Sequence, residues 1–294
     1  MQLNSILTLV DKPKHPQTAI ARTRQLIRES GAAAHLVAYC WHAVPDGDGL
    51  FTRKDARVLK DRLVAEHRAW LMEEVSAFKE LEGARVSVLW TDDIADSLQR
   101  IAAQTSVDLI VKSIHQSGTL LHTPLDWELL RTSPAPVLLT TTRARRKRSN
   151  VVLAAVDTRR MDRAHTRLNR RVLDSAHAFA SLQGGTVHVV SALDIPTVLV
   201  DLDVVDKRKV TREARLLAQQ RLTELLAPYD IPASRRHFPA GKVGQAVNHV
   251  ARSMNADLLV VGSMAHRLKR LVGIGTSAEK IVSRAVCDVL AVHP

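Results

Sequence analysis

The residues best suited to chemistry lie in the segment GSMAHRLKRLVGIGTSAEK, near the carboxyl end of the sequence. Gly262 and Ala265 open it, and Gly275 and Thr276 follow after a basic stretch. Small residues let backbone amides approach phosphate oxygens, and a helix that starts behind them directs its positive end at the same anion. The hydroxyl groups of Thr276 and Ser277 can donate further hydrogen bonds. The segment therefore predicts a phosphate-binding loop.

The same residues also have a purely structural interpretation. Thr276 and Glu279 have the spacing of a capping box, so Thr276 could serve only to start a helix. Gly275 could serve only to permit the tight turn before that helix. The complete spacing, placed after a predicted strand, favours nucleotide binding over this alternative.

Predicted strands and helices alternate along the chain and would position this loop. Continuous apolar runs rich in Val, Leu and Ile indicate strands that are buried on both faces, and helical-period segments separate them. Strand–helix–strand repeats of this kind fold as parallel sheets with right-handed crossovers. The predicted strands are residues 5–11, 34–41, 84–90, 107–112 and 136–141, then 150–156, 185–192, 233–238, 257–262 and 287–292.

The two sets of strands belong to two copies of one sequence pattern. SILTLVDK near the start matches VVLAAVDT, which aligns Asp11 with Asp157. Four matches in the same order are rare by chance, so we infer two homologous halves. The further matches align His35 with His188, Asp108 with Asp257, and Val137 with Val289.

Each half is predicted to be a doubly wound, Rossmann-like α/β domain with a five-stranded parallel sheet. The two tandem domains span residues 1–142 and 150–294. The segment RARRKR between them, residues 143–148, is interpreted as a solvated connector because its like charges repel. The last strand of each half would otherwise be an open sheet edge, so we expect the halves to pack through these strands as an internal pseudo-dimer, which could form further homo-oligomers.

The order of the strands predicts where a ligand would bind in the second half. If each sheet has the order 3-2-1-4-5, its crevice lies at the carboxyl ends of the first and fourth strands. In the second half these strands end at Asp157 and Gly262, so their loops should face each other.

The first half differs at the same crevice. Asp11 is kept, but Ser113 replaces the first glycine. A helix predicted to start at Pro124 carries Asp126 and Glu128 in its first turn, where carboxylates favour the helix dipole themselves. These charges would repel phosphate, so we expect no nucleotide triphosphate in the first half.

The glycine-rich segment resembles the nucleotide-binding signature of the universal stress protein family, glycine-x2-glycine-x9-glycine-Ser/Thr, with Ala265 in place of the second glycine. The resemblance covers nearly the whole chain, as two such domains in tandem. It implies a cytoplasmic stress-response protein that binds ATP or a related adenine nucleotide in its second half. Mg²⁺ could be bound together with the nucleotide. The binding residues that the resemblance implies are Val156 and Asp157 at the adenosine, and Gly262, Ser263, Ala265, Gly275, Thr276 and Ser277 at the ribose and phosphates.

Composition limits the other functions. The net charge of +12 favours anionic partners, but only 3% of the residues are aromatic, which argues against a binder of single-stranded nucleic acid. Two cysteines fit a reducing compartment. The start of the chain lacks the features of a signal peptide, and no apolar run reaches the ~18 residues of a membrane span. We therefore expect a cytoplasmic protein.

No catalytic or metal-binding arrangement stands out. Cys40, His42, His115 and His122 lack the spacing of a zinc site, so a packed cysteine and surface histidines are the favoured interpretation. No nucleophile–base arrangement can be argued from spacing, so we expect no enzyme. Three rival functions remain open: a nucleic-acid-associated protein using residues 143–148, a nucleotide-free scaffold or binder of an apolar metabolite, and an ATP-consuming enzyme of a related superfamily.

Overall fold

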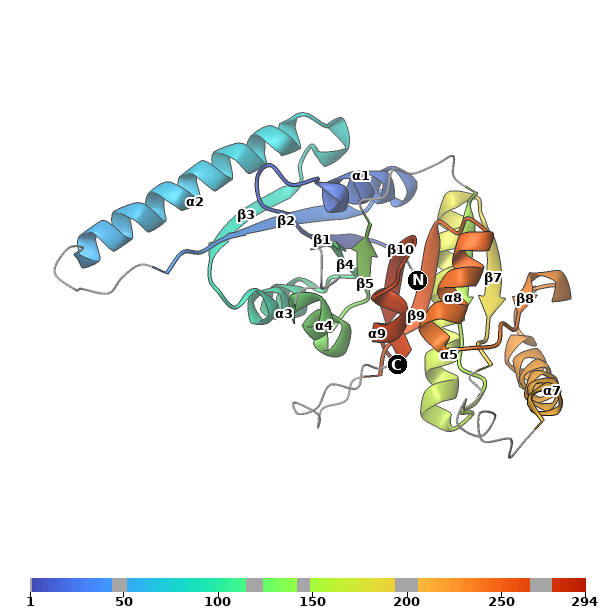
Figure 1. Ribbon diagram of the computed structural model, residues 1–294. Helices are drawn as coiled ribbons and strands as arrows, with labels where there is room; N and C mark the ends of the chain where they lie inside the picture. The colour runs from blue at the N-terminus through green and yellow to red at the C-terminus, as the bar shows by residue number, and fades with distance from the viewer. Residues whose placement is uncertain (1, 44–51, 115–123, 142–148, 194–205, 265–276) are drawn as a thin grey trace. The chain divides into compact units, whose positions relative to one another are not determined.

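The computed structural model describes residues 2–43, 52–114, 124–141, 149–193, 206–264 and 277–294 (Figure 1). By its internal contacts the chain divides into two compact units. The N-terminal unit contains Gln2–Ile114 and Ser133–Thr142, and the C-terminal unit contains Arg143–Pro294 together with His115–Thr132. Helix α4 (Pro124–Thr132) therefore belongs to the C-terminal unit, although it precedes the second half in the sequence.

The strands of the N-terminal unit are all parallel and follow the order β3-β2-β1-β4-β5. This confirms the predicted order 3-2-1-4-5. β4 and β5 are buried throughout, as expected for strands covered on both faces, whereas the edge strand β3 is only partly buried. The strands are β1 (Ser5–Leu9), β2 (Ala33–Cys40), β3 (Arg85–Trp90), β4 (Leu109–Ser113) and β5 (Val137–Thr140).

The helices of this unit begin and end at residues suited to those positions. Thr52 and Asp55 form a capping box at the start of α2, and Gly31 ends α1 in the left-handed conformation with a φ of 71°. The helices are α1 (Thr18–Ser30), α2 (Arg53–Ser76) and α3 (Ile94–Thr105), with a short 3₁₀ turn η1 (Lys79–Leu81) before β3.

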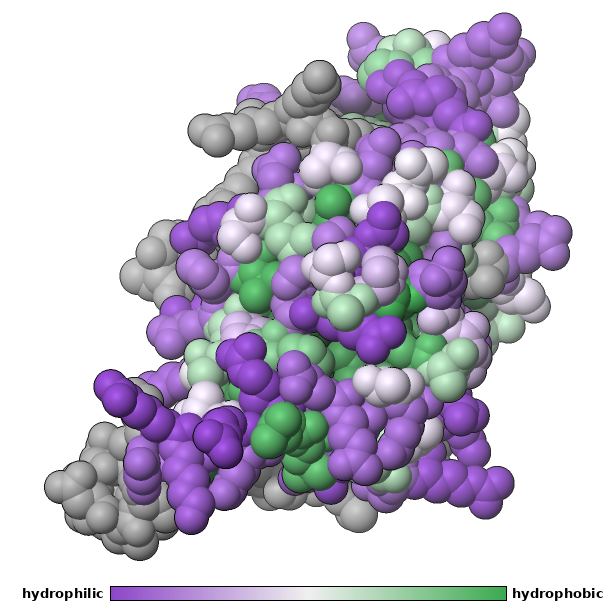
Figure 2. Space-filling view, turned by 90° about the vertical axis from the view of Figure 1, so that its right-hand side faces the viewer, coloured by the Kyte–Doolittle hydropathy of each residue, from purple (hydrophilic) through white to green (hydrophobic). Residues whose placement is uncertain are grey.

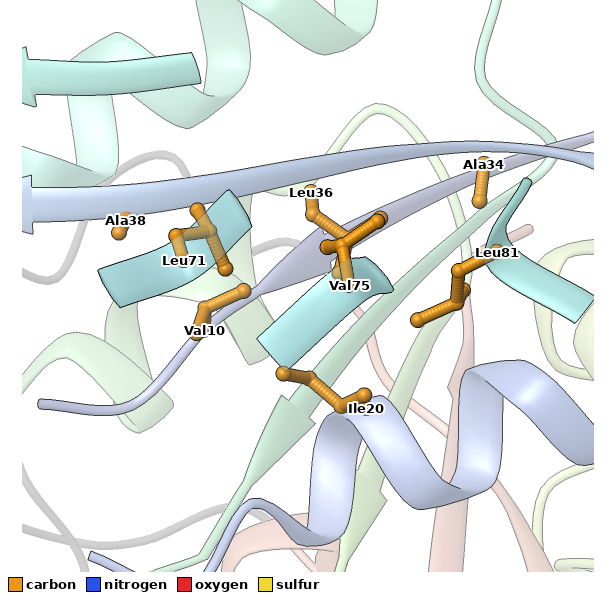
Figure 3. Close-up of a cluster of buried hydrophobic side chains, with 8 residues drawn as sticks. All are labelled: Val10, Ile20, Ala34, Leu36, Ala38, Leu71, Val75 and Leu81. Atoms are coloured by element: carbon orange, nitrogen blue, oxygen red, sulfur yellow. The ribbon is translucent and has the colours of Figure 1, made fainter. Parts of the chain in front are cut away.

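One hydrophobic cluster packs β2 against these helices (Figure 3). Alternate residues of a strand lie on the same face, and β2 uses Ala34, Leu36 and Ala38 in this way. Leu36 and Leu71 are completely buried. Burying one such leucine side chain contributes about 1.5–3 kcal/mol, so the cluster is a major source of stability. Its members are Val10, Ile20, Ala34, Leu36, Ala38, Leu71, Val75 and Leu81.

The C-terminal unit repeats the same topology. Its parallel strands follow the order β10-β9-β6-β7-β8, which is again 3-2-1-4-5 when read from β8. The strands are β6 (Val151–Ala155), β7 (Thr186–Val190), β8 (Arg236–His237), β9 (Leu258–Gly262) and β10 (Asp288–Val292). The helices are α5 (Arg163–Gln183), α7 (Lys207–Leu226), α8 (Val243–Ser253) and α9 (Ser277–Val282).

Strand β8 is shorter than the predicted strand 233–238. Residues Ala233–Arg235 form the 3₁₀ turn η2 instead, directly after Pro232. Pro239 follows β8 closely, and a proline has no N–H to donate to a neighbouring strand. The two prolines therefore leave little room for a regular edge strand.

Residues repeated between the halves serve the same structural purpose. The Asp108 carboxylate accepts hydrogen bonds from the backbone N–H groups of Asn4 (2.8 Å) and Ser5 (3.0 Å). The Asp257 carboxylate accepts one from the backbone of Asn150 (2.7 Å). Each aspartate thus fixes the start of the first strand in its own unit, so this part of the repeat is explained by folding.

None of the helices in the described ranges is both long enough and apolar enough to cross a membrane.

Candidate functional site

A cavity of about 70 Å³ lies in the C-terminal unit at the carboxyl ends of β6 and β9. This is the crevice at which a doubly wound sheet binds ligands. Val156 and Asp157 follow β6, Gly262 ends β9, and Ser277 and Ala278 begin α9. Four of the predicted site residues therefore share one cavity.

The turn after β6 is fixed by a buried amide. The backbone N–H of Asp157 donates to Oδ1 of Asn169 (3.0 Å), and Nδ2 of Asn169 donates to the carbonyl of Asp157 (2.9 Å). Asn169 lies on α5 and is buried. Because both backbone groups of Asp157 are held, its side chain is directed by the fold rather than by a flexible loop.

The carboxylate of Asp157 is paired with Arg159. Nε of Arg159 donates to Oδ1 (3.0 Å), Nη2 donates to Oδ2 (3.1 Å), and the backbone N–H of Arg159 also donates to Oδ1 (2.9 Å). Burial raises the pKa of Asp157, but the hydrogen bonds from Arg159 outweigh it, so the pKa lies below its ordinary value. Asp157 is therefore an ionised acceptor that is already engaged.

A second arginine holds the same loop from α7. Nη1 of Arg221 donates to the carbonyls of Thr158 (2.9 Å) and Arg159 (3.1 Å). The backbone that carries Arg159 is thus anchored, while the Arg159 side chain itself remains partly exposed. Sequence reasoning missed both arginines, because neither lies in a recognisable motif.

Gly262 has a packing role that does not depend on any ligand. A Cβ atom added at this position would lie 2.6 Å from Cγ of Leu168, far inside van der Waals contact. Leu168 lies on α5, is buried, and also lines the cavity. The glycine is thus required for close approach of α5 to β9, whatever occupies the cavity.

Ser263, which was predicted to contact the nucleotide, instead contacts α4. It is buried and does not line the cavity. Its hydroxyl donates to the carbonyl of Leu130 on α4, and its own carbonyl is hydrogen-bonded to Nδ1 of His293 (3.1 Å). The side chain of Ser263 therefore fastens α4 to the end of β9.

Glu279 on α9 also contacts α4. Its buried carboxylate accepts hydrogen bonds from Nε (2.7 Å) and Nη2 (2.6 Å) of Arg131. The predicted partner of Glu279 in a capping box, Thr276, lies outside the described residues. Ser277 is exposed at the start of α9, a helix of only six residues, so any anion there would rely on its first N–H groups rather than on a long helix dipole.

The other residues of the predicted phosphate loop, Ala265 and Gly275, also lie outside the described residues, as do the basic segment 143–148 and the two histidines His115 and His122. Of the zinc candidates that remain, Cys40 is buried and burial raises the pKa of its thiol, whereas His42 is exposed. Within the described ranges, no three His, Cys, Asp or Glu side chains come together in a group that could hold a metal ion.

Hydrogen-bonded side chains lie at the end of β4, the equivalent position of the N-terminal unit. Ser113 ends β4, and its buried hydroxyl oxygen accepts hydrogen bonds from the backbone N–H of Ala19 (3.0 Å) and from Oγ1 of Thr18 (2.8 Å). Thr18 is also hydrogen-bonded to Thr140 (2.9 Å). This network links the end of β4 to the start of α1 and to β5.

The two carboxylates predicted to repel phosphate in the first half lie on α4, which belongs to the C-terminal unit. Asp126 is fully buried there, and Glu128 is exposed. Both carboxylates are therefore residues of the C-terminal unit, although their position in the sequence assigned them to the first half.

Comparison with known proteins agrees with this architecture. A model of the universal stress protein family matches residues 150–293. Universal stress protein A homolog 1 of Coxiella burnetii is 32% identical over 131 residues, which cover 42% of this chain and 87% of that protein. Universal stress protein E of Photorhabdus laumondii is 21% identical over 300 residues, which cover 99% of this chain and 95% of that protein.

Solved structures extend the likeness to the fold of the whole chain. The crystal structure of a universal stress protein from Archaeoglobus fulgidus has a TM-score of 0.65 at 15% identity, covering 99% of this chain and 98% of that one. A protein of unknown function from Pseudomonas aeruginosa PAO1 has a TM-score of 0.69 at 24% identity, covering 99% and 93%. The doubled sequence pattern, the two matching sheets and these relatives together show that the chain belongs to the universal stress protein family.

Proposed function

We propose that the C-terminal unit binds ATP or a related adenine nucleotide at the carboxyl ends of β6 and β9. The observation that carries this proposal is the position of Asp157, whose backbone is held by Asn169 and whose ionised carboxylate lies at the crevice between the two strands. The protein would act as a cytoplasmic stress-response regulator or protective factor, because a ligand that prefers one conformation can change which partners are bound.

The described residues suit an adenosine group better than they suit free phosphate. The carboxylate of Asp157 can accept hydrogen bonds from the amino group of adenine or from a ribose hydroxyl. Val156, Val190 and Val247 give the cavity an apolar wall against which a base could pack. Phosphates would extend towards Ser277.

Binding would require Arg159 to release Asp157. The described residues enclose only about 70 Å³, whereas pockets for small ligands usually measure about 300–1,000 Å³. The Arg159 side chain lies partly exposed at the cavity, so it can turn towards solvent without disturbing the buried core. A nucleotide would then exchange an internal ion pair for its own hydrogen bonds, and the freed guanidinium would change the charge of the surface that partners meet.

Mg²⁺ would be carried by the phosphates rather than by the protein. Among the described residues that line the cavity, Asp157 supplies the carboxylate, and Arg159 already holds it. Magnesium prefers oxygen ligands and keeps much of its water, so it does not need a dedicated protein site here.

The small volume of the cavity favours one alternative function, a nucleotide-free scaffold. In that case Leu168 and the valine side chains fill the crevice as core, and Arg159 closes it permanently. The nucleic-acid alternative rests on residues 143–148 and on the overall charge, and it predicts binding that weakens steeply with salt and shows no preference for adenine.

The purified protein distinguishes these functions directly. After denaturation, the supernatant is analysed for released nucleotides, and the native protein is titrated calorimetrically with ATP and with adenosine. Adenine nucleotide in near-stoichiometric amount, or saturable uptake of both ligands, is expected. Absence of bound nucleotide together with no heat from either ligand would establish the scaffold alternative.

A further inference from the structure

A second, larger cleft lies in the C-terminal unit and shares no lining residue with the nucleotide cavity. It measures about 650 Å³, within the range of roughly 300–1,000 Å³ typical of small-molecule sites. Figure 2 faces the side of the molecule on which α7 and β8 lie in Figure 1, and hydrophilic side chains predominate there, with apolar groups between them. Arg215, Gln219 and Thr223 line the cleft from α7, at the four-residue spacing that puts them on one helix face.

Two guanidinium groups in this cleft are held in place by backbone carbonyls. Nη2 of Arg215 donates to the carbonyl of Phe238 (3.2 Å). Nε and Nη2 of Arg236 both donate to the carbonyl of Ile231 (3.0 and 2.7 Å), and Nη1 donates to the hydroxyl of Thr223 (3.4 Å). These acceptors orient the groups but do not neutralise their charge.

The lining contains cationic and hydrogen-bonding groups but, in the part of the chain that is described, no carboxylate. Neither Arg215 nor Arg236 forms an ion pair within those ranges. His249 enters from α8, and His237 enters from β8. The His237 ring is stacked on His188 and shares a hydrogen bond with it (3.1 Å), which fixes the imidazole in the wall.

The N-terminal unit provides an internal comparison. It has a cleft of about 660 Å³ that also adjoins the outermost strand and the helix before it, here β3 and α2. Its lining mixes Arg68 and Lys79 with Glu82, and includes the apolar side chains of Met72 and Phe78. A cleft at this place is therefore a feature of the fold, whereas a lining whose charged side chains are all cationic is found in the C-terminal unit.

We propose that the cleft between α7, β8 and α8 binds a small organic polyanion, a metabolite-sized molecule with at least two phosphate or carboxylate groups. Guanidinium groups bind both kinds of oxyanion through paired, charge-assisted hydrogen bonds. The hydroxyls of Thr223 and Ser253 already donate to the carbonyls of Gln219 and Val250, so the charged donors are the two guanidinium groups. Phe238 and Val250 offer an apolar surface to a carbon skeleton. This site is independent of the proposed nucleotide cavity.

The test is a calorimetric titration of the full chain with inorganic pyrophosphate, which carries two phosphate groups. Saturable binding is expected, and Arg215→Gln should weaken it roughly tenfold, since a charge-assisted pair is lost. Arg215 is exposed, so this variant should fold normally. The matched control is Arg212→Gln, which removes an exposed arginine of the same helix that does not line the cleft and should leave affinity unchanged.

An NMR measurement locates the bound pyrophosphate in the cleft. Pyrophosphate should shift the imidazole NMR signals of His237 and His249, while Asp157→Asn, which weakens the proposed nucleotide site, should not alter this binding. No heat at millimolar pyrophosphate would overturn the proposal. Equal losses from Arg212→Gln and Arg215→Gln, together with tighter and steeply salt-dependent binding of a mixed-sequence oligonucleotide, would overturn it in favour of a diffuse nucleic-acid surface.

Discussion

The ends of the fourth strands differ between the two units, although the strands themselves are equivalent. Ser113 ends β4, and its hydroxyl joins a network with Thr18 and the backbone of Ala19. Gly262 ends β9, where the absence of a side chain lets Leu168 approach and leaves a cavity beside it. One residue thus distinguishes a strand end that is tied to the next helix by side-chain hydrogen bonds from a strand end with a cavity beside it, while the strand order is unchanged.

The largest effect is expected from Gly262→Val. The new side chain would overlap Leu168, and overpacking of this kind should lower the free energy of unfolding by about 2–3 kcal/mol. Denaturant unfolding measures the loss. In the double variant with Leu168→Ala, the cost should be smaller than the sum of the two single costs. Strict additivity would show that Leu168 is not the cause.

The next effect concerns the C-terminal unit alone. Arg131→Gln removes the partner of the buried Glu279 carboxylate and should lower stability by about 1–2 kcal/mol. Arg100→Gln is the control, because its ion pair with Asp96 is largely exposed and should be worth less than about 0.5 kcal/mol. Equal losses would argue that α4 does not pack in this unit.

Substitutions of the two equivalent aspartates, Asp157 and Asp11, should differ in their effect on ATP affinity. Asp157→Asn should weaken ATP roughly tenfold, or about 1.4 kcal/mol, because the amide is a poorer acceptor for the adenosine. Asp11→Asn should leave the affinity unchanged, since the strand beside it ends in Ser113, whose hydroxyl is already hydrogen-bonded to α1, and not in a glycine. Titration calorimetry of both variants measures the difference, and a comparable loss in each would place a second nucleotide in the N-terminal unit.

The smallest expected effect is an increase in nucleotide affinity. Arg159→Ala removes the side chain that competes for Asp157, so adenosine and ATP should both bind about threefold more tightly, which corresponds to roughly 0.6 kcal/mol. Adenosine has no phosphate, so it separates two roles of the arginine. If ATP weakens while adenosine is unaffected, Arg159 binds phosphate and does not act as a competitor.

The sheet was predictable from the sequence because its strands are continuous apolar runs, repeated twice in one order. The strand ends were correct within a few residues, and the strand order followed from the general behaviour of doubly wound folds. The shortness of β8 could also have been anticipated from Pro232 and Pro239.

The contacts around the cavity could not be predicted in the same way. Arg159 lies two residues after Asp157, in a stretch that resembles any solvated loop, and its pairing depends on the turn that Asn169 fixes. The contact of Ser263 with Leu130 joins residues far apart in the sequence, and α4, which carries Leu130, belongs to the C-terminal unit although it lies in the first half of the sequence. Local sequence patterns predict neither the ion pair of Arg159 nor the position of α4.

The placement of α4 has a consequence for synthesis. This helix is translated between β4 and β5, yet Leu129 and Leu130 are completely buried in a unit whose β9 and α9 are translated much later. Domains commonly fold in order as they leave the ribosome. Here two contacts that hold α4 in the C-terminal unit, those of Leu130 with Ser263 and of Arg131 with Glu279, form only after β9 and α9 have been synthesised. The completion of α4 therefore precedes its docking by roughly 6–26 seconds, the time needed to synthesise about 130 residues at ~5–20 residues per second.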